Sequence, residues 1–554
     1  MTESQPLIDT FLAQEYDERP VRASGLGLTR FDDRLDDLSA SGFERRDAQA
    51  AEWLTRFQAV DSAGLSVDEA IDRDLILAVL RGRAILREWA EWRREPLTYI
   101  EPITSGVYGL FLDRLRPEHE LVDAAIARLE AAPAALEAGK ANLDPGLASP
   151  LIIRRAMGGT RGAASYCREF LPAEVADGPD RLRLAAAGEQ AARALDAFVA
   201  FLGDLAERAS GTWQLGEERY SRLLQERELL SLDARQLRDR GQAEYDRVAA
   251  EMRELSQRTQ GGPDFQAVLE QANTVHAADE EGMRQTYEAW TEKARRFLAR
   301  SALVTLPPGE ECAVVPSPPF RRPVVGVAGY SSPPAFSDRL LGHFYVPFLP
   351  EGSSPDEIRQ RLESNSDGDI PTVSVHETYP GHHWHLVMRK ANPRPVRSVF
   401  GTPYFSEGWA LYAERAMREQ GFFEEPIQEL YHLNATLFRA ARIIVDTSLH
   451  LGEMDVEAAV AFMAHKAAMP EPTARVEVGR YCAWPTQASA YLTGCLEILR
   501  IRDAYLAARG YAGAAGEAPI DLLRDFHDTL TGSGSLPPAL AERAALASTA
   551  RPAA

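Results

Sequence analysis

A ten-residue stretch at positions 376–385, HETYPGHHWH, holds four of the eleven histidines of the chain and a carboxylate beside the first of them. About thirty residues later, positions 406–414 read SEGWALYAE. Zinc binds imidazole nitrogen and carboxylate oxygen, and a catalytic zinc site keeps one coordination position open for water. Clustered histidines followed by a carboxylate on a separate helix therefore predict a catalytic zinc site and a zinc-dependent hydrolase.

The spacing of the histidines differs from the usual His-Glu-x-x-His pattern, which places two imidazoles on one helical face. Pro380 takes the place of the second ligand, and His382 would point about 120° away from His376 on a regular helix. His383 returns to the face of His376 but lies about 10.5 Å along the axis, too far for two bonds of about 2.1 Å to one ion. Pro380 lacks an N–H and Gly381 tolerates unusual backbone angles, so we predict a two-residue bulge that restores an i+4-like relation.

Both segments contribute to the predicted zinc ligands, which are His376, His382 and Glu407. His383 is kept as the competing ligand or as a hydrogen-bond donor behind the ligands. Glu377 is predicted to be the general base, which takes a proton from the attacking water and passes it to the leaving amine. Glu414 follows Glu407 by two helical turns on the same face and is predicted to orient a ligand histidine.

The segment around position 480 supplies candidates for the rest of the site. The tetrahedral oxyanion needs a hydrogen-bond donor besides zinc, and Tyr481 and Tyr491 are predicted for that role. Arg480 either neutralises a substrate carboxylate or fixes one of the tyrosines. The predicted substrate-binding residues are Arg480, Arg442, Gln487 and Tyr345.

Three polar residues, Arg442, Asp446 and His450, recur at intervals of four and so share one helical face. Two interpretations of this face remain open. The residues line the cleft, with Asp446 behind a zinc histidine, or they form a buried salt-bridge ladder.

These motifs resemble those of a known family. HETYPGHH followed by SEGWALYAE is similar to the pattern HExxPGHH…SEGWALYAE of a bacterial family of zincin-like proteins that is related to the gluzincin metallopeptidases. The SEGWA element also resembles the NEGFA element of aminopeptidase N-type enzymes, and the carry-over makes Glu407 the third zinc ligand. Residues 442–450 and 480–491 resemble further family motifs, with Ser448 and Thr486 in place of glycines. The resemblance implies a zinc cofactor and peptidase activity.

Composition excludes several other function classes. The net charge of −21 and the pI of about 5.1 argue against a nucleic-acid partner, which requires a basic face. The four cysteines show no CxxC pairing and suggest reduced thiols in the cytoplasm. We see no signal peptide at the N-terminus and no apolar run of about 20 residues, so we expect a cytoplasmic protein without a membrane partner.

The fold is predicted to be mainly α, a large helical protein with a small β-sheet beside a zincin-like (gluzincin) catalytic helix. We expect a helical scaffold over 1–300 and a catalytic region over 301–554, with a substrate cleft between the halves of one integrated fold. Short edge strands are expected within 301–350 and metal-site helices within 371–508. The expected helices cover 66–81, 117–140, 179–208, 232–258, 355–362, 406–420, 425–450, 455–468, 486–508 and 519–531, and the strands 313–315, 324–327 and 343–348.

Three functions agree with these residues. The first is a zinc metallopeptidase that acts on peptides, and the second is a zinc hydrolase of another amide or ester in small-molecule metabolism. The third is a catalytically inactive helical binding protein without metal. Pro380 favours the third because it removes the standard ligand position, whereas Glu377 argues against it because a binding protein has no use for a general base.

Overall fold

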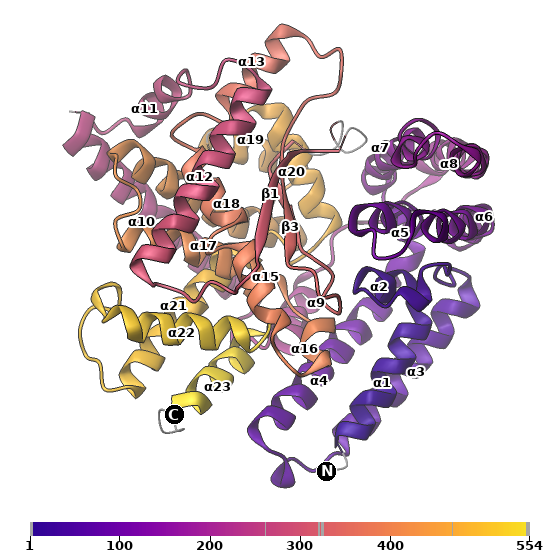
Figure 1. Cartoon of the computed structure of the whole chain (residues 1–554), viewed down its shortest axis with the longest axis horizontal. Coiled ribbons are helices and arrows are strands. Elements are labelled where there is room, and N and C mark those ends of the chain that lie inside the picture. The colour runs from indigo at the N-terminus through magenta and orange to yellow at the C-terminus, as the bar shows by residue number, and fades with distance from the viewer. Residues whose placement is uncertain (1–3, 261, 319–321, 323–325, 468, 550–554) are drawn as a thin grey trace.

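The computed structural model describes residues 4–260, 262–318, 322, 326–467 and 469–549. The fold is mainly helical with one small three-stranded sheet, as the sequence predicts. In Figure 1 the strands stand near the centre of the molecule, and the helices of the first 208 residues, in indigo and purple, lie to one side of them. None of the helices in the described ranges combines the length and apolar composition needed to cross a bilayer.

The α-helices before the sheet are α1 (Ser4–Glu18), α2 (Pro20–Gly25), α3 (Ala40–Gln58), α4 (Val67–Trp89), α5 (Glu101–Asp113), α6 (Glu118–Asn142), α7 (Pro150–Ser165), α8 (Pro179–Arg208), α9 (Glu217–Arg222), α10 (Ala234–Gln260), α11 (Phe265–Ala272) and α12 (Glu280–Ser301). The strands are β1 (Glu311–Pro316), β2 (Gly329–Ser331) and β3 (Leu341–Val346). The later α-helices are α13 (Pro355–Glu363), α14 (Ile370–Glu377), α15 (His382–Lys390), α16 (Pro395–Val399), α17 (Pro403–Glu419), α18 (Pro426–His450), α19 (Val456–Lys466), α20 (Glu471–Ala483), α21 (Ala490–Ala508), α22 (Ile520–Gly532) and α23 (Pro538–Thr549).

Local sequence signals account for where several helices begin. A capping box opens α4, the helix predicted from residue 66: the hydroxyl of Ser66 accepts from the backbone N–H of Glu69, whose carboxylate accepts from the backbone N–H of Ser66. Ser354 and Glu357 form the same arrangement at the start of α13. Such caps satisfy backbone donors that the first helical turn leaves without intrahelical partners.

The hydrophobic core does not divide at residue 300. One cluster of buried side chains runs from Ile8 through Leu298 to Trp409 and Leu540, so it joins the two halves of the chain. A second cluster lies wholly within 38–206 and is built by α5 to α8. Helix α10 packs along α18, and α12 packs against α14. The first 300 residues therefore directly support the helices that carry the histidine segment.

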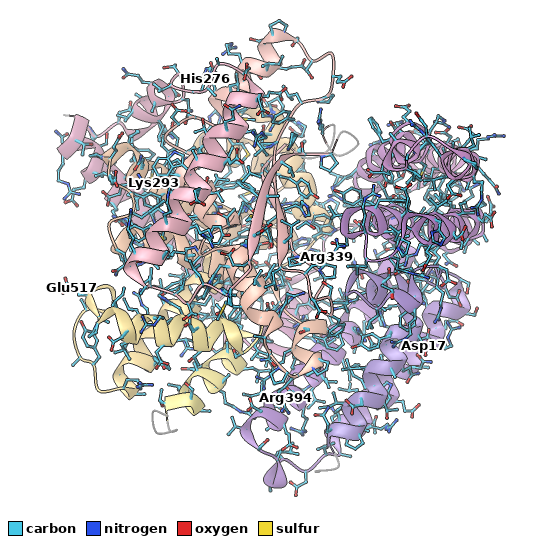
Figure 2. The ribbon with its side chains drawn as sticks, in the orientation of Figure 1. Asp17, His276, Lys293, Arg339, Arg394 and Glu517 are labelled. Carbon is cyan, nitrogen blue, oxygen red and sulfur yellow. The ribbon has the colours of Figure 1, made fainter. Side chains whose placement is uncertain are left out.

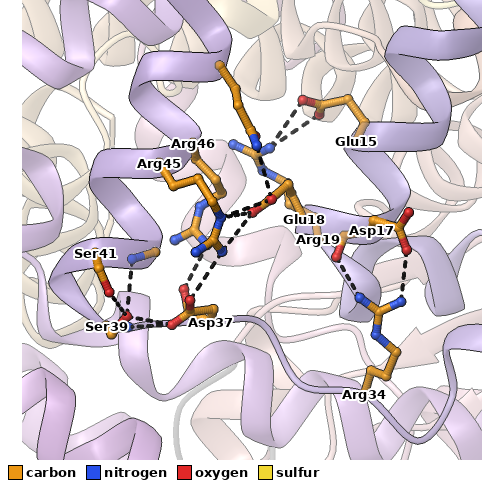
Figure 3. A network of polar contacts seen from close by, with 12 residues as sticks. Glu15, Asp17, Glu18, Arg19, Arg34, Asp37, Ser39, Ser41, Arg45 and Arg46 are labelled. Carbon is orange, nitrogen blue, oxygen red and sulfur yellow. Dashed lines mark hydrogen bonds and ion pairs between the residues drawn. The ribbon is translucent and has the colours of Figure 1, made fainter.

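Ion pairs tie the N-terminal helices together at the surface (Figure 3). Arg45 of α3 lies 3.0 Å from Glu18 and 3.1 Å from Asp37. Arg34 lies 2.9 Å from Asp17. Because at least one side chain of each pair is exposed, each pair is expected to contribute only about 0.2–1 kcal/mol to stability.

The sheet differs from its prediction in one respect. Its strand order is β1-β3-β2, with β3 parallel to β1 and antiparallel to β2. The run predicted at 343–348 therefore forms the central strand and not an edge, because Pro347 comes after the last paired residue, Val346. The strand predicted at 324–327 lies partly outside the described residues. The two outer strands are β1 and β2.

Several helices fall outside the individually predicted ranges, and α20 and α23 are two of them. Helix α20 lies between two predicted helices, and α23 occupies the C-terminal stretch that its alanine-rich composition suggests is frayed. Leu540 and Ala541 of α23 are buried against α21. Tertiary packing of this small apolar face stabilises a helix that composition alone does not predict.

A close helix crossing fixes the position of α17, the helix that carries Glu407. Gly408 of α17 and Gly494 of α21 face each other, and a Cβ atom on either would overlap the backbone of the opposite helix. For Gly494 the overlap is with the carbonyl oxygen of Tyr404. Glycine is therefore required at this crossing, and the register of Glu407 depends on it.

Replacing Gly494 with alanine is expected to lower the free energy of unfolding by about 1–3 kcal/mol, because the methyl group forces the two helices apart. Urea denaturation measures this change. The control is Gly158→Ala in α7, where a Cβ meets no atom within 4 Å. That variant should be neutral or up to about 1 kcal/mol more stable, since alanine is the better helix former. Equal stabilities of the two variants would contradict the tight crossing.

Candidate metal centre

The histidine segment is an interrupted helix. Helix α14 ends at Glu377, α15 begins at His382, and the link between them includes a cis peptide bond at Tyr379–Pro380. The N–H of Gly381 donates to the carbonyl of Val375 at 3.1 Å, a bond that spans six residues where a regular helix spans four. The predicted two-residue insertion is therefore present, but it breaks the helix into two and does not form a bulge within one.

Gly381 is required by this geometry. A Cβ atom at this position would overlap the carbonyl oxygens of Val375 and His376. The preceding Pro380 has no N–H to donate, and its carbonyl accepts a hydrogen bond from the indole of Trp409 at 2.8 Å. The last turn of α14 and the first turn of α15 are thereby held close to α17.

Three side chains converge where α14, α15 and α17 meet. Nε2 of His376 lies 3.6 Å from Oε2 of Glu407, and Nε2 of His382 lies 3.2 Å from the same oxygen. The two imidazole rings are nearly perpendicular, with centroids 4.9 Å apart. One donor atom from each residue falls within 4.8 Å of the others, and no other such group of His, Cys, Asp or Glu occurs among the residues that the structure describes. His276, by contrast, lies at the outer edge of the molecule (Figure 2).

Glu414 lies directly behind His376. Its Oε1 is 2.7 Å from Nδ1 of His376, and its Oε2 is 3.3 Å from Nδ1 of His432. Burial would raise the pKa of Glu414, but the guanidinium of Arg439 and the hydrogen bond to His376 lower it to about 2. Burial likewise acts to lower the pKa of His376, and hydrogen bonds to Glu407 and Glu414 raise it to about 9. His432 and Arg439 were not predicted, because they carry no motif and reach Glu414 only through tertiary packing.

The pairing with Glu414 leaves Nε2 of His376 free to face Glu407 and a metal. Replacing Glu414 with glutamine is therefore expected to weaken zinc binding by about 10- to 100-fold, because the partner that fixes the ring and increases its basicity is lost. Competition with a fluorescent zinc chelator measures the affinity. The control is Glu424→Gln, whose side chain is 69% exposed. Equal affinities of the two variants would remove Glu414 from the site.

Glu377 and Tyr491 lie next to the three converging side chains. Glu377 is only 9% exposed, and burial raises the pKa of its carboxyl group. A carboxylate with a raised pKa exchanges protons more readily near neutral pH. The ring of Tyr491 stacks on His376 with centroids 6.4 Å apart, and Gln487 Nε2 lies 3.4 Å from the Tyr491 hydroxyl. Both residues therefore border the group formed by His376, His382 and Glu407.

The structure corrects the competing assignment of His383. Its ring is fully buried and faces away from Glu407, with Nε2 3.0 Å from Glu310 and Nδ1 2.9 Å from the Tyr330 hydroxyl. Glu310 also accepts from Tyr379 and pairs with Arg295 at 2.8 Å. Both nitrogens of His383 are occupied in a structural network, so it is not a ligand of the converging group.

Tyr481 is also placed differently from its predicted catalytic role. Its hydroxyl donates to Glu477 at 2.8 Å and accepts from Arg442 at 3.2 Å. Arg480 pairs with the same carboxylate at 3.1 Å. Tyr481 is therefore held behind Tyr491 by a buried ionic cluster, and its hydroxyl is already engaged. Glu477 was missed because the sequence carries no signal that two arginines share it.

Asp446 and Tyr345 make contacts other than those predicted for them. Asp446, on α18, accepts a hydrogen bond from the Tyr220 hydroxyl of α9 at 2.7 Å and lies 3.7 Å from His450. These contacts join α18 to α9, and neither involves a predicted zinc ligand. Tyr345 lies in the central strand β3, and its hydroxyl is 2.9 Å from that of Tyr108 on α5. The face shared by Arg442, Asp446 and His450 is buried. Arg442 and His450 both bond to α20, the first at Glu477 and the second at the carbonyl of Tyr481, whereas Asp446 bonds to Tyr220 of α9, so the three do not form one continuous salt-bridge ladder.

The chain matches a family model over most of its length and shares its fold with solved structures. A family model described as "Bacterial protein of unknown function (DUF885)" matches residues 20–544. No curated protein matches. A structure described as "a putative lipoprotein of unknown function from Shewanella oneidensis" is 21% identical, with a TM-score of 0.78 over 98% of this chain and 99% of that one. A "putative lipoprotein from Colwellia psychrerythraea" is 18% identical, with a TM-score of 0.81 over 99% of this chain and 100% of that one.

These comparisons correct the family resemblance stated above. The matching family is DUF885, and neither its description nor those of the two structures names a zincin or a metallopeptidase. The predicted relationship to the gluzincin metallopeptidases is therefore wrong as a statement of family. The cytoplasmic location stays a prediction.

Proposed function

We propose that this chain, which belongs to the DUF885 family of bacterial proteins, is a zinc-dependent hydrolase that cleaves peptide bonds. The observation that carries the proposal is the convergence of His376, His382 and Glu407, whose donor atoms lie within 4.8 Å of one another. These residues come from three separate helices, so their meeting requires the interrupted helix and the glycine crossing described above. A group of this kind beside the buried Glu377 supports catalysis more than metal storage.

The donor set fits zinc. Two imidazole nitrogens and one carboxylate oxygen form a common ligand set of catalytic zinc, which leaves a position for water and substrate. Nδ1 of His376 is engaged by Glu414, and the ring therefore presents Nε2 to the metal. Zinc held by these three residues would supply the Lewis acidity that activates water and polarises a carbonyl group.

The neighbouring residues of the chain perform the proton transfers. Glu377 takes the proton of the attacking water and delivers it to the leaving amine. The hydroxyl of water is added to the acyl carbon, the amide C–N bond breaks, and the amine leaves with the added proton. Tyr491 donates a hydrogen bond to the oxygen on which negative charge develops. Burial raises the pKa of Tyr491, so its hydroxyl keeps its proton at neutral pH.

The sheet favours a peptide over other amides. Its outer strand β2 lies beside α15, and the Tyr330 hydroxyl of β2 is 2.9 Å from His383 of that helix. The edge of a sheet presents backbone N–H and C=O groups that can pair with an extended peptide. A substrate strand along β2 would run past the helix that carries His382.

The test combines metal analysis with peptide cleavage. We expect the purified protein to contain about one zinc per chain and to cleave members of a mixed peptide library, with products identified by mass spectrometry. A chelator should abolish cleavage, and added zinc should restore it. Cleavage of amide or ester metabolites without cleavage of any peptide would favour the second class of hydrolase. Protein without zinc and without cleavage would support a binding role.

A further inference from the structure

Two arginines share one carboxylate beside the candidate metal centre. Arg442 and Arg480 donate to the same oxygen of Glu477, at 2.9 and 3.1 Å. The guanidinium carbon of Arg442 also lies 4.6 Å from the ring centroid of Tyr491, a ring that stacks on His376 as well. One carboxylate cannot balance two guanidinium groups. The three side chains Arg442, Arg480 and Glu477 together therefore carry a net positive charge beside Tyr491.

A third arginine joins this cluster from the N-terminal half of the chain. Helix α7 packs against α20, and the side chain of Arg155 on α7 passes over Gly479, where a Cβ atom would lie 4.0 Å from Arg155 Cδ. Its guanidinium carbon is 4.7 Å from the ring centroid of Trp484. Burial, and in smaller part the charge of Arg480, act to lower the pKa of Arg155. The cationic cluster thus extends from Tyr491 to Trp484, which is 38% exposed.

Two donors of this cluster have no acceptor. Nη1 of Arg155 and Nε of Arg480 are buried and make no hydrogen bond within the described chain. The carboxylates of Glu95 and Glu101 are close enough to interact with Arg155, but no ion pair joins either of them to it among the residues placed by the structure. Buried N–H groups almost always have partners. Guanidinium groups match a carboxylate in shape and charge, so an anion of that kind would satisfy both donors.

We propose that Arg155 and Arg480, with Trp484 beside them, bind the terminal carboxylate of the substrate, so that the protein acts on peptides with a free C-terminus. The inference rests on the proposed function and adds a substrate class to it. Arg155 and Arg480 position the peptide and take no part in bond breaking. Trp484 offers an apolar surface to the side chain of the terminal residue. The carboxylate at one end and the metal at the other limit cleavage to bonds near the C-terminus.

The experiment uses the zinc-loaded full chain and matched peptide libraries that differ only in a free or an amidated C-terminus. The unsubstituted protein should cleave the free acids with a kcat/KM about 10- to 100-fold higher than the amides, the usual range for losing a hydrogen bond to a charged group. In Arg155→Gln the ratio of kcat/KM for the free acids to that for the amides should fall toward one, mainly because KM for the acids rises. The matched control is Arg154→Gln, one residue away on the same helix, where the arginine side chain is 63% exposed. That control should keep the preference.

Arg480→Gln is the second variant. Thermal melting checks that this variant, which lacks the ion pair between Arg480 and Glu477, remains folded. Equal cleavage of acids and amides by the unsubstituted protein would overturn the inference. An unchanged preference in both Arg155→Gln and folded Arg480→Gln would overturn it as well. Cleavage of both libraries without discrimination would leave the peptidase proposal standing, so the two failures are distinguishable.

A binding measurement keeps the inference testable without turnover. Calorimetry compares acetyl-dialanine with its amide on the zinc-loaded protein. Binding of the acid should weaken about 10-fold or more in Arg155→Gln and stay unchanged in Arg154→Gln. A carboxylate held through zinc alone would bind equally well to both variants, and that result would overturn the inference.

Discussion

Replacement of Glu377 by glutamine is expected to lower kcat for peptide hydrolysis by about 10²- to 10⁴-fold while zinc remains bound, since a positioned general base contributes that much. Glutamine keeps the size of the side chain and its hydrogen-bonding oxygen but cannot accept the proton of water. The residue is nearly enclosed, and burial raises its pKa, so glutamine also removes a buried ionisable group. Stability should therefore be unchanged or slightly higher.

Three measurements on this variant separate chemistry from binding: zinc content, kcat and KM. A fall in kcat with an unchanged zinc content assigns Glu377 to proton transfer. The control is Glu351→Gln, an exposed glutamate in the loop before α13. Full turnover by Glu377→Gln would show that another group acts as the base.

Replacement of His382 or Glu407 by alanine is expected to reduce zinc from about one ion per chain to nearly none, because two protein ligands do not retain zinc against competing chelators. The loss should also appear in stability. Zinc present at about 1,000 times its dissociation constant adds about 4.1 kcal/mol to the folded state, and a variant without the site loses that addition. Metal analysis and thermal melting with and without added zinc measure the two effects.

His383 provides the discriminating comparison. Both of its ring nitrogens are engaged by Glu310 and Tyr330, so His383→Gln should lower stability while zinc stays bound. His465, in the last turn of α19, is the surface control for the loss of a histidine. If His383→Gln loses zinc and His382→Ala keeps it, the ligand assignment from the structure is wrong.

Much of the site is determined by local sequence. The spacing from His376 to His382, with Pro380 and Gly381 between them, excludes a regular helix on geometric grounds alone, and the structure contains the two extra residues as a break between α14 and α15. Glu414 lies two turns after Glu407, and the structure places it on His376. The helix starts at capping boxes are likewise determined by local sequence, because the interacting groups are only three residues apart.

Other features were decided only by the tertiary structure. Adjacent residues on a helix point about 100° apart, so the choice between His382 and His383 depends on how α15 restarts and on Glu310, which is distant in sequence. The regular spacing of Arg442 and Asp446 shows that they share a face, but it cannot show that the first meets Glu477 and the second Tyr220. Arg155 reaches the cluster near the site because α7 packs on α20. Spacing along one helix determines which side chains lie together, whereas the packing of helices far apart in sequence determines what they contact.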